Sequence, residues 1–216
     1  MTNSGERPAE LADIQGAWRR DGRTFDGSPW NEVTDVLWVQ AGHHFCDLRT
    51  PLPRTAPTHM FDQPQAFSGT VQLSGGYISF HHDLDSLNRD PNHPDQGTVH
   101  RLGDAMYERG PGFEERWVVA SLPGDDAFVA EWSDAGGHPA APIAARIVRV
   151  GPLAIAVWGG PLAGGTQFHR RHGWEPGRSW RYEGAPVNLI EAAQALGFGD
   201  PLPVGWTVVS PTDRPT

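Results

Sequence analysis

Short runs of alternating apolar and polar residues follow one another along most of the chain. Alternation with a period of two is typical of β-strands that bury one face and expose the other. About ten short strands are therefore predicted, bounded by residues that favour turns. The runs that carry this pattern cover residues 33–40, 43–50, 67–73, 77–85, 98–102, 105–109, 113–122, 128–132, 143–150, 153–158, 167–172 and 179–183.

The turns between these runs indicate antiparallel neighbours. Gly75-Gly76 and Gly103-Asp104 each separate two runs, and such dipeptides are typical of tight hairpins. No helical crossover segment is predicted between the strands, which excludes a parallel sheet built from βαβ units. The pattern therefore predicts an all-β, antiparallel barrel or sandwich.

One helix is predicted near the end of the chain. Asn188 can cap it, Glu191 stands three residues later as in a capping box, and Gly197 supplies a stop. Its apolar residues at helical spacing are Leu189, Ile190, Ala193 and Leu196. We expect this helix to pack on the outside of a barrel or to cover one of its mouths.

A short motif precedes the series of strands. Gly16-Ala17-Trp18, the strand meander and the late helix together resemble the calycin, or lipocalin-like, barrels, in which a Gly-x-Trp motif opens the first strand. The resemblance implies that Trp18 closes one end of the barrel, with Arg20 or Arg181 as its partner, and that the barrel holds an internal ligand cavity. We expect a lipocalin-like antiparallel β-barrel of about ten strands with one late C-terminal helix.

Length and composition suit one large β domain, with 216 residues of which 38% are hydrophobic. We expect a single barrel domain over residues 9–209, flanked by disordered residues 1–8 and 210–216.

No apolar run reaches the ~20 residues that cross a bilayer. The first residues also lack the basic segment followed by an apolar segment that is typical of a signal peptide. A single cysteine, Cys46, excludes an internal disulfide, so a reducing compartment, the cytoplasm, is expected.

The formal net charge is −9, from 26 acidic and 17 basic residues. A surface of this sign repels phosphate groups, so neither nucleic acid nor an acidic membrane is an expected partner. The expected partner is a small organic ligand, and a homodimer is left open.

The most unusual segment runs from His81 to His100 and is dense in histidine and aspartate. Strict alternation places His82 with Phe80 on an apolar face, and Asp83 with Asp85 on the other. Three interpretations are left open. They are a solvated face with one buried histidine, an acid–base site in which Asp83 or Asp85 orients His82 or His81, and a metal site without a compact ligand spacing.

A second candidate segment is the strand predicted over residues 43–50. Asp47 and Arg49 share one face, where they form a structural ion pair or, alternatively, Arg49 offers a planar fork to a ligand oxygen. His44 and Cys46 share the other face. His44 is a candidate ligand contact, whereas Cys46 has no recognisable histidine partner and is not expected to be a nucleophile.

A third candidate is Glu108, whose pKa would be raised if the strand turned it into a desolvated interior. The alternative is a cross-strand ion pair with Arg116. Trp38, Phe80 and Trp117 lie within predicted strands and are candidates for the wall of a ligand cavity.

No nucleotide-binding glycine motif and no Gly-x-Ser-x-Gly elbow occurs, so neither cofactor nor metal is expected. The first hypothesis is a small-molecule-binding barrel with cofactor-independent acid–base chemistry of the isomerase, lyase or cyclase type. It uses His82 as base or proton donor, Arg49 as anion stabiliser and Glu108 as a second acid. The alternatives are a non-catalytic carrier or sensor of a small hydrophobic ligand, and a haem- or metal-binding barrel.

Overall fold

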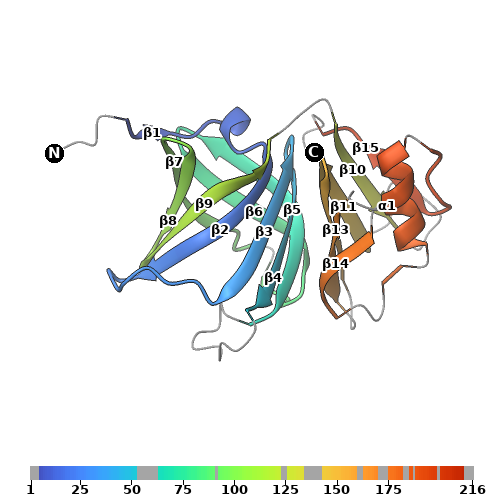
Figure 1. Ribbon diagram of the computed structural model, residues 1–216, viewed down its shortest axis with the longest axis horizontal. Helices are drawn as coiled ribbons and strands as arrows, with labels where there is room; N and C mark the ends of the chain where they lie inside the picture. Colours follow the sequence, from blue (N-terminus) through green and yellow to red (C-terminus); the bar gives the residue numbers. More distant parts are fainter. Residues whose placement is uncertain are drawn as a thin grey trace.

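Antiparallel strands make up most of the protein. The computed structural model describes residues 5–52, 63–90, 92–122, 126–133, 143–159, 163–169, 175–181, 185–186, 188–198 and 200–211. Within these residues there are two antiparallel sheets and one α-helix (Figure 1). The expected all-β, antiparallel class with one late helix is thereby confirmed. None of the described helices is long and apolar enough to cross a membrane.

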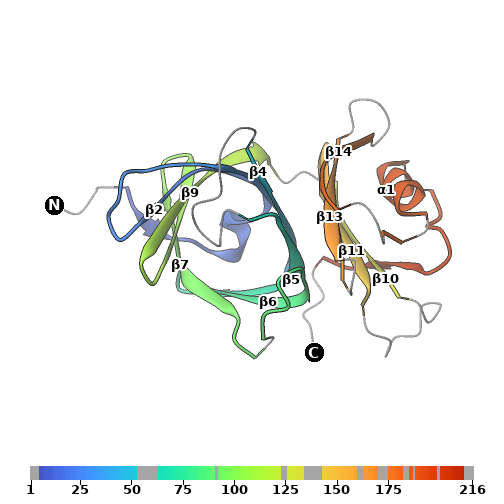
Figure 2. The same cartoon turned by 90° about the horizontal axis from the view of Figure 1, so that it is seen from below.

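Eight strands form a closed up-and-down barrel, seen as a ring in Figure 2. Each strand pairs with the next one along the chain, and the last strand returns to pair with the first. The strands are β2 (Gly16–Phe25), β3 (Thr34–Ala41), β4 (His44–Pro51), β5 (Gln65–Ser74), β6 (Tyr77–Asp85), β7 (Asp95–Leu102), β8 (Ala105–Gly110) and β9 (Phe113–Ser121). A closed barrel leaves these strands no free edges along their paired lengths.

One end of the barrel is closed by residues that precede β2. The 3₁₀ helix η1 (Leu11–Asp13) leads into Ile14, whose carbonyl oxygen accepts a hydrogen bond of 2.8 Å from Nε1 of Trp18. The Trp18 ring is buried, and the guanidinium carbon of Arg101 in β7 lies 5.1 Å from its centroid. The residue that stacks on Trp18 is therefore Arg101 and not Arg20, whose side chain binds Glu32 and Glu115.

A second sheet and the helix form two further layers outside the barrel (Figures 1 and 2). The sheet has the order β14 (Glu175–Trp180), β13 (Gly164–His169), β12 (Leu153–Trp158), β11 (Ala145–Val150), β10 (Ala127–Trp132) and β15 (Trp206–Val209). One face of this sheet packs on the outside of β3, β4 and β5, and the other face packs on α1 (Leu189–Phe198). The helix therefore neither touches the barrel wall nor covers a mouth, because the second sheet lies between them.

The sequence of β3 explains why a second sheet covers this side of the barrel. Leu37 and Val39 point outward into the apolar layer shared with the second sheet, whereas Val36 and Trp38 point into the barrel. A strand that is apolar on both faces needs cover on both. The late strands therefore form a separate sheet that covers this part of the barrel, rather than adding to a ten-stranded barrel.

Both ends of the described part of the chain pair with strands or turns of the barrel. Arg7 and Pro8 form the short strand β1, which pairs with His100 and Arg101 of β7. The carbonyl oxygen of Pro211 accepts a hydrogen bond of 3.1 Å from the backbone of His43. Of the segments expected to be disordered, 1–8 and 210–216, residues 1–4 and 212–216 lie outside the described residues.

Candidate functional site

The barrel contains a cavity of about 350 Å³ at the end opposite Trp18. Its mouth is formed where β2 ends, where β6 joins β7 and where β8 turns into β9, at Phe25, Pro94 and Pro111. The aromatic residues of its wall are Phe25, Trp38, Phe45, Phe67, Phe80, Phe113 and Trp117. Phe80 and Trp117 each pack edge-on against Trp38, with ring centroids 5.5 Å apart in both pairs. The wall is therefore a set of mutually supporting rings, which suits a flat ligand.

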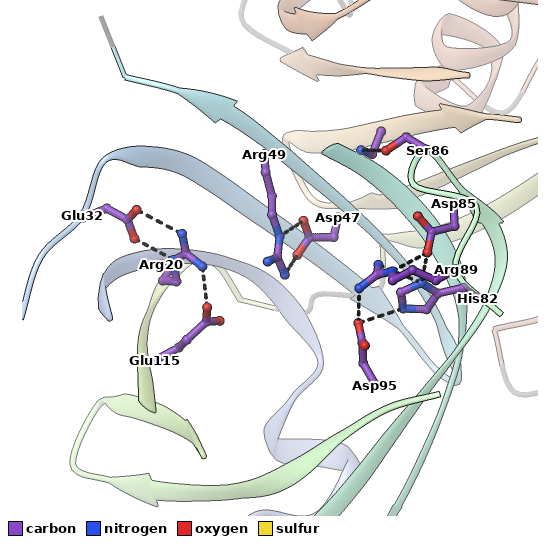
Figure 3. A network of polar contacts seen from close by, with 11 residues as sticks. Arg20, Glu32, Asp47, Arg49, His82, Asp85, Ser86, Arg89, Asp95 and Glu115 are labelled. Carbon is purple, nitrogen blue, oxygen red and sulfur yellow. Dashed lines mark hydrogen bonds and ion pairs between the residues drawn. The ribbon is translucent and has the colours of Figure 1, made fainter. Parts of the chain in front are cut away.

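An ion pair from β4 lies on the wall. Phe45, Asp47 and Arg49 point into the barrel, as alternation predicts, and Nε of Arg49 lies 2.9 Å from Oδ1 of Asp47 (Figure 3). Burial raises the pKa of Asp47 despite the neighbouring guanidinium. Burial acts to lower the pKa of Arg49, but the negative charges of Asp47, Glu115 and Glu108 together offset it and the pKa is raised. Arg49 is thus a charged group that already has a partner.

A second ion-pair group lies beside the cavity. Nη1 of Arg20 lies 2.5 Å from Oε1 of Glu115, and Nε of Arg20 lies 2.6 Å from Oε2 of Glu32 (Figure 3). The Arg20 side chain is 0% exposed, so its charge depends on these two carboxylates. Burial alone would raise the pKa of Glu115, but Arg20 and Arg49 lower it overall.

Glu108 lies directly opposite Glu115 in the register of β8 and β9. It lines the cavity and is 9% exposed, and no hydrogen bond or salt bridge joins it to any described residue. Burial, and then the negative charge of Glu115, raise the pKa of Glu108 to about 8. The expected alternative, a pair with Arg116, is wrong, because Arg116 lies opposite Tyr107 and binds Asp21. Glu108 is therefore a largely protonated carboxyl group at neutral pH.

The histidine and aspartate segment forms a cluster at the edge of the cavity, whose wall includes Arg89 and Asp95. Nδ1 of His82 lies 2.8 Å from Oδ2 of Asp85, and Arg89 binds both Asp85 and Asp95 at 2.6 Å (Figure 3). Burial acts to raise the pKa of Asp85, but His82 and Arg89 lower it to about 2. The His82 ring stacks on Phe67, with centroids 4.8 Å apart, so it contacts the cavity wall from behind.

A β-bulge decides which side chains of β6 face inward. Ser68 pairs with Leu84 and Gly69 pairs with His82, so Asp83 is an extra residue in β6. Two residues of the bulged strand oppose one on its partner, which shifts the alternation by one position. The predicted alternation is therefore wrong beyond His82. Asp85 joins His82 on the inner side, whereas Leu84 packs in the layer beneath the second sheet.

Two candidate residues lie outside the barrel interior. Asp83 binds Nη2 of Arg146 in β11 at 2.7 Å, so it joins the barrel to the second sheet and does not orient His82. His44 is buried on the outer face of β4, where burial and the charge of Arg146 lower its pKa. His44 therefore does not reach the cavity, because the residues of β4 that face inward are its odd-numbered ones.

The cavity nevertheless brings together five residues that the sequence singled out: Trp38, Arg49, Phe80, Glu108 and Trp117. Sequence reasoning missed Glu115 as the neighbour of Glu108 and Arg20 as the cation that holds Glu115. A signal was present, because the two-residue turn Pro111-Gly112 places Glu108 and Glu115 opposite each other. In the described part of the chain, no three histidine, cysteine or acidic side chains come close enough to hold a metal ion.

Comparisons with known proteins support the fold. No family model matches the chain, and no curated protein matches it. An uncharacterized protein from Saccharomyces cerevisiae has a similar structure, with a TM-score of 0.52, 16% identity, and coverage of 77% of this chain and 86% of that one. At this identity the likeness concerns the fold alone.

Two bacterial structures also match in part. One is a lipocalin-like protein from Bacteroides uniformis, with a TM-score of 0.36, 15% identity, and coverage of 50% of this chain and 98% of that one. The other is an uncharacterized protein from Bacteroides eggerthii, with a TM-score of 0.35, 13% identity, and coverage of 48% and 96%. The eight-stranded antiparallel meander begins with Gly16-Ala17-Trp18, closes into a barrel and has the Trp18 ring at one end. This is the layout that the resemblance to the lipocalin-like barrels predicts.

Proposed function

We propose that this protein binds a small, flat organic molecule inside its barrel. The observation that supports the proposal is a cavity of about 350 Å³ walled by seven aromatic rings and closed at its far end. Ligand sites are concave and mostly apolar, with a few placed polar groups, and have volumes from roughly 300 Å³ upward. Here the polar groups include Glu108 and the pair of Asp47 and Arg49, and the others on the wall are Arg89, Asp95, Gln96 and Glu115.

The test compares two tryptophan substitutions in exposed turns at opposite ends of β8. Pro111→Trp places an indole at the mouth of the cavity, and Asp104→Trp places one at the far end of the barrel. We expect the neutral fluorescent probe N-phenyl-1-naphthylamine to bind the unaltered protein with one site. Its affinity should fall at least about tenfold in Pro111→Trp and stay unchanged in Asp104→Trp. Absence of probe binding, or equal binding by both variants, would refute the proposal.

A second candidate function is acid–base catalysis of the isomerase or lyase type without a cofactor. The observation that favours it is the raised pKa of Glu108, because a carboxyl group that titrates near neutrality can give and take a proton. His82 with Asp85 would be a second proton-transfer group, although it lies behind Phe67. A non-catalytic carrier or sensor would need the cavity but no proton-transfer group.

Deuterium exchange separates the catalyst from the carrier. A compound that co-purifies with the protein, identified by native mass spectrometry, is incubated with the protein in deuterium oxide. An enzyme that moves a proton to and from carbon makes the compound heavier, and Glu108→Gln slows this gain. A carrier leaves the mass unchanged. An absorption spectrum and metal analysis of the same sample test the haem or metal alternative.

We propose the cytoplasm as the setting of this binding function. The single cysteine, Cys46, is buried, which agrees with a reducing compartment. The net charge of −9 supports a small molecule as the partner rather than nucleic acid or an acidic membrane.

A further inference from the structure

The charges around the cavity are paired with one exception. Arg49 binds Asp47, Arg89 binds Asp95, and Arg20 binds Glu115 and Glu32. Each of these guanidinium groups therefore has a carboxylate partner. Among the described residues of the cavity wall, Glu108 is the carboxyl group that has none.

The groups that face Glu108 come from several strands. Glu115 lies opposite it on β9, Asp47 and Arg49 approach from β4, and Asp95 approaches from β7. Three of these four neighbours are acidic, and the single cation among them is already bound to Asp47. The charge of Arg49 is therefore balanced by Asp47, and among the described residues no cation forms an ion pair with Glu108 itself. A positively charged ligand would supply that partner.

The rest of the wall suits a cation as well. Phe45, Phe80, Trp38 and Trp117 line the cavity that Glu108 faces. The Phe67 ring also lines it, but the guanidinium groups of Arg49 and Arg89 already lie 4.8 Å and 4.9 Å from its centroid. The negative face of an aromatic ring attracts a cation, and several rings together form a cage for an organic ammonium group. A carboxylate among aromatic rings is thus a site for a positively charged organic molecule rather than for an anion.

We infer that the cavity selects a small alkyl amine that carries an aromatic ring, bound in its ammonium form, with Glu108 as the counter-ion of the ammonium group. The inference rests on the proposed ligand-binding function and names the chemical class of the ligand. The aromatic part of the ligand lies among the rings, and the ammonium group replaces the proton of Glu108. That proton leaves to solvent, so binding exchanges one positive charge for another.

This exchange has a defined pH dependence. The pKa of Glu108 is about 8 in the empty cavity, so below pH 8 the ligand competes with a proton. Affinity for the ammonium ion should therefore fall by up to about tenfold for each pH unit below 8. An alkyl amine stays protonated to about pH 9, so the ligand itself does not titrate in this range.

The experiment uses three probes of nearly the same shape and different charge. They are 2-phenylethylammonium, neutral 2-phenylethanol and anionic 3-phenylpropanoate, measured by calorimetry with the full chain at pH 6 and pH 8. We expect the cation to bind at least about tenfold more tightly than the alcohol at pH 8, because an adjacent opposite charge favours an ionised carboxyl group by one pKa unit or more. At pH 7, calorimetry in buffers of different ionisation enthalpy should show about one proton released for each cation bound.

Two variants make the assignment specific. Glu108→Gln keeps the shape of the side chain and should abolish the preference for the cation, the release of the proton and the pH dependence. Glu114→Gln removes a carboxylate that pairs with Arg109 outside the cavity, and it should leave all three unchanged. A cation preference that survives in Glu108→Gln would overturn the inference.

The remaining outcomes separate this inference from the proposed function. If the alcohol binds as tightly as the cation at pH 8, protonated Glu108 serves as a hydrogen-bond donor and the choice of a cation is overturned, while ligand binding stands. If none of the three compounds binds but N-phenyl-1-naphthylamine does, the inference is overturned alone. If that neutral probe also fails to bind, the proposed function and the inference fall together.

Discussion

Glu108 and Glu115 lie directly opposite each other on β8 and β9, with both carboxyl groups turned into the barrel. Two buried carboxyl groups at this separation do not ionise independently, because each negative charge disfavours the other. The position of Arg20 determines which of the two carboxyl groups is ionised. Arg20 binds Glu115 and keeps that group charged, so Glu108 retains its proton.

The first prediction concerns the stability of the protein as a function of pH. The pKa of Glu108 rises from 4.5 to about 8 on folding, so between these values the native protein holds a proton that the unfolded chain has lost. The stability that this group contributes is therefore full below pH 4.5 and is lost as the pH rises toward 8. We expect Glu108→Gln to gain roughly 2–4 kcal/mol in free energy of unfolding relative to the unaltered protein across this range. Urea titrations at several pH values measure the difference.

The matched control for that experiment is Glu114→Gln. Glu114 is next to Glu115 in β9, but it pairs with Arg109 away from the cavity. Its pH profile should run parallel to that of the unaltered protein. A Glu108→Gln profile that also runs parallel would contradict the raised pKa of Glu108.

The second prediction concerns Arg20. Replacing it by methionine leaves Glu115 and Glu32 without their cation, and Glu115 is 7% exposed. Removing one partner of a buried ion pair costs about 3–5 kcal/mol, and we expect Arg20→Met to lose that much free energy of unfolding at pH 7. Arg116→Met is the control, since Arg116 forms a surface pair with Asp21 and should cost about 1 kcal/mol or less. Equal losses in the two variants would refute the role given to Arg20.

The third prediction concerns the bulge that turns Asp85 toward His82. A Cβ atom on Gly69 would overlap the carbonyl oxygen of His81 across the β5–β6 pair. The backbone of β6 could move away from it only if the bulge were lost. We expect Gly69→Ala to lose at least about 2 kcal/mol of unfolding free energy and to move His82 away from Asp85. Thermal unfolding measures the first effect, and the shift of the His82 ring signals in NMR measures the second.

Gly22→Ala provides the comparison for Gly69→Ala. A Cβ atom on Gly22 would meet only the side chain of Trp30, which is 46% exposed and can move. Its loss of stability should be clearly smaller. If Gly22→Ala is as destabilising as Gly69→Ala, the bulge does not explain the need for glycine at position 69.

The fourth prediction concerns Cys46, which lies between β4 and the second sheet. The thiol is 0% exposed, and burial raises its pKa to about 12. Because the thiolate is the reactive form, the folded protein should not react with a disulfide reagent at pH 8, whereas the protein in urea should react fully. Rapid labelling of the folded protein would show that the second sheet opens away from the barrel.

Much of the architecture followed from local pattern, and the reasons can be seen in single elements. Period-two alternation with Gly75-Gly76 and Gly103-Asp104 at the turns defines antiparallel hairpins, because both signals act over a few residues. The same alternation placed Asp47 and Arg49 on the inner face of β4, where they lie. It failed in β6, because a bulge depends on the partner strand and leaves no mark in the alternation itself.

The sequence by itself determined that this protein is built from antiparallel hairpins, since turn chemistry and alternation are properties of neighbouring residues. The place of Trp18 at one end of a barrel was an implication of the resemblance that Gly16-Ala17-Trp18 carries. Only the tertiary structure decided that eight strands close the ring, that the remaining strands form a second layer, and that Arg101 rather than Arg20 covers Trp18. It also decided the state of Glu108, whose raised pKa depends on burial and on charges from β4, β7 and β9. Such long-range effects arise when segments distant in the chain meet, because desolvation and Coulomb interaction depend on distance in space and not on distance along the sequence.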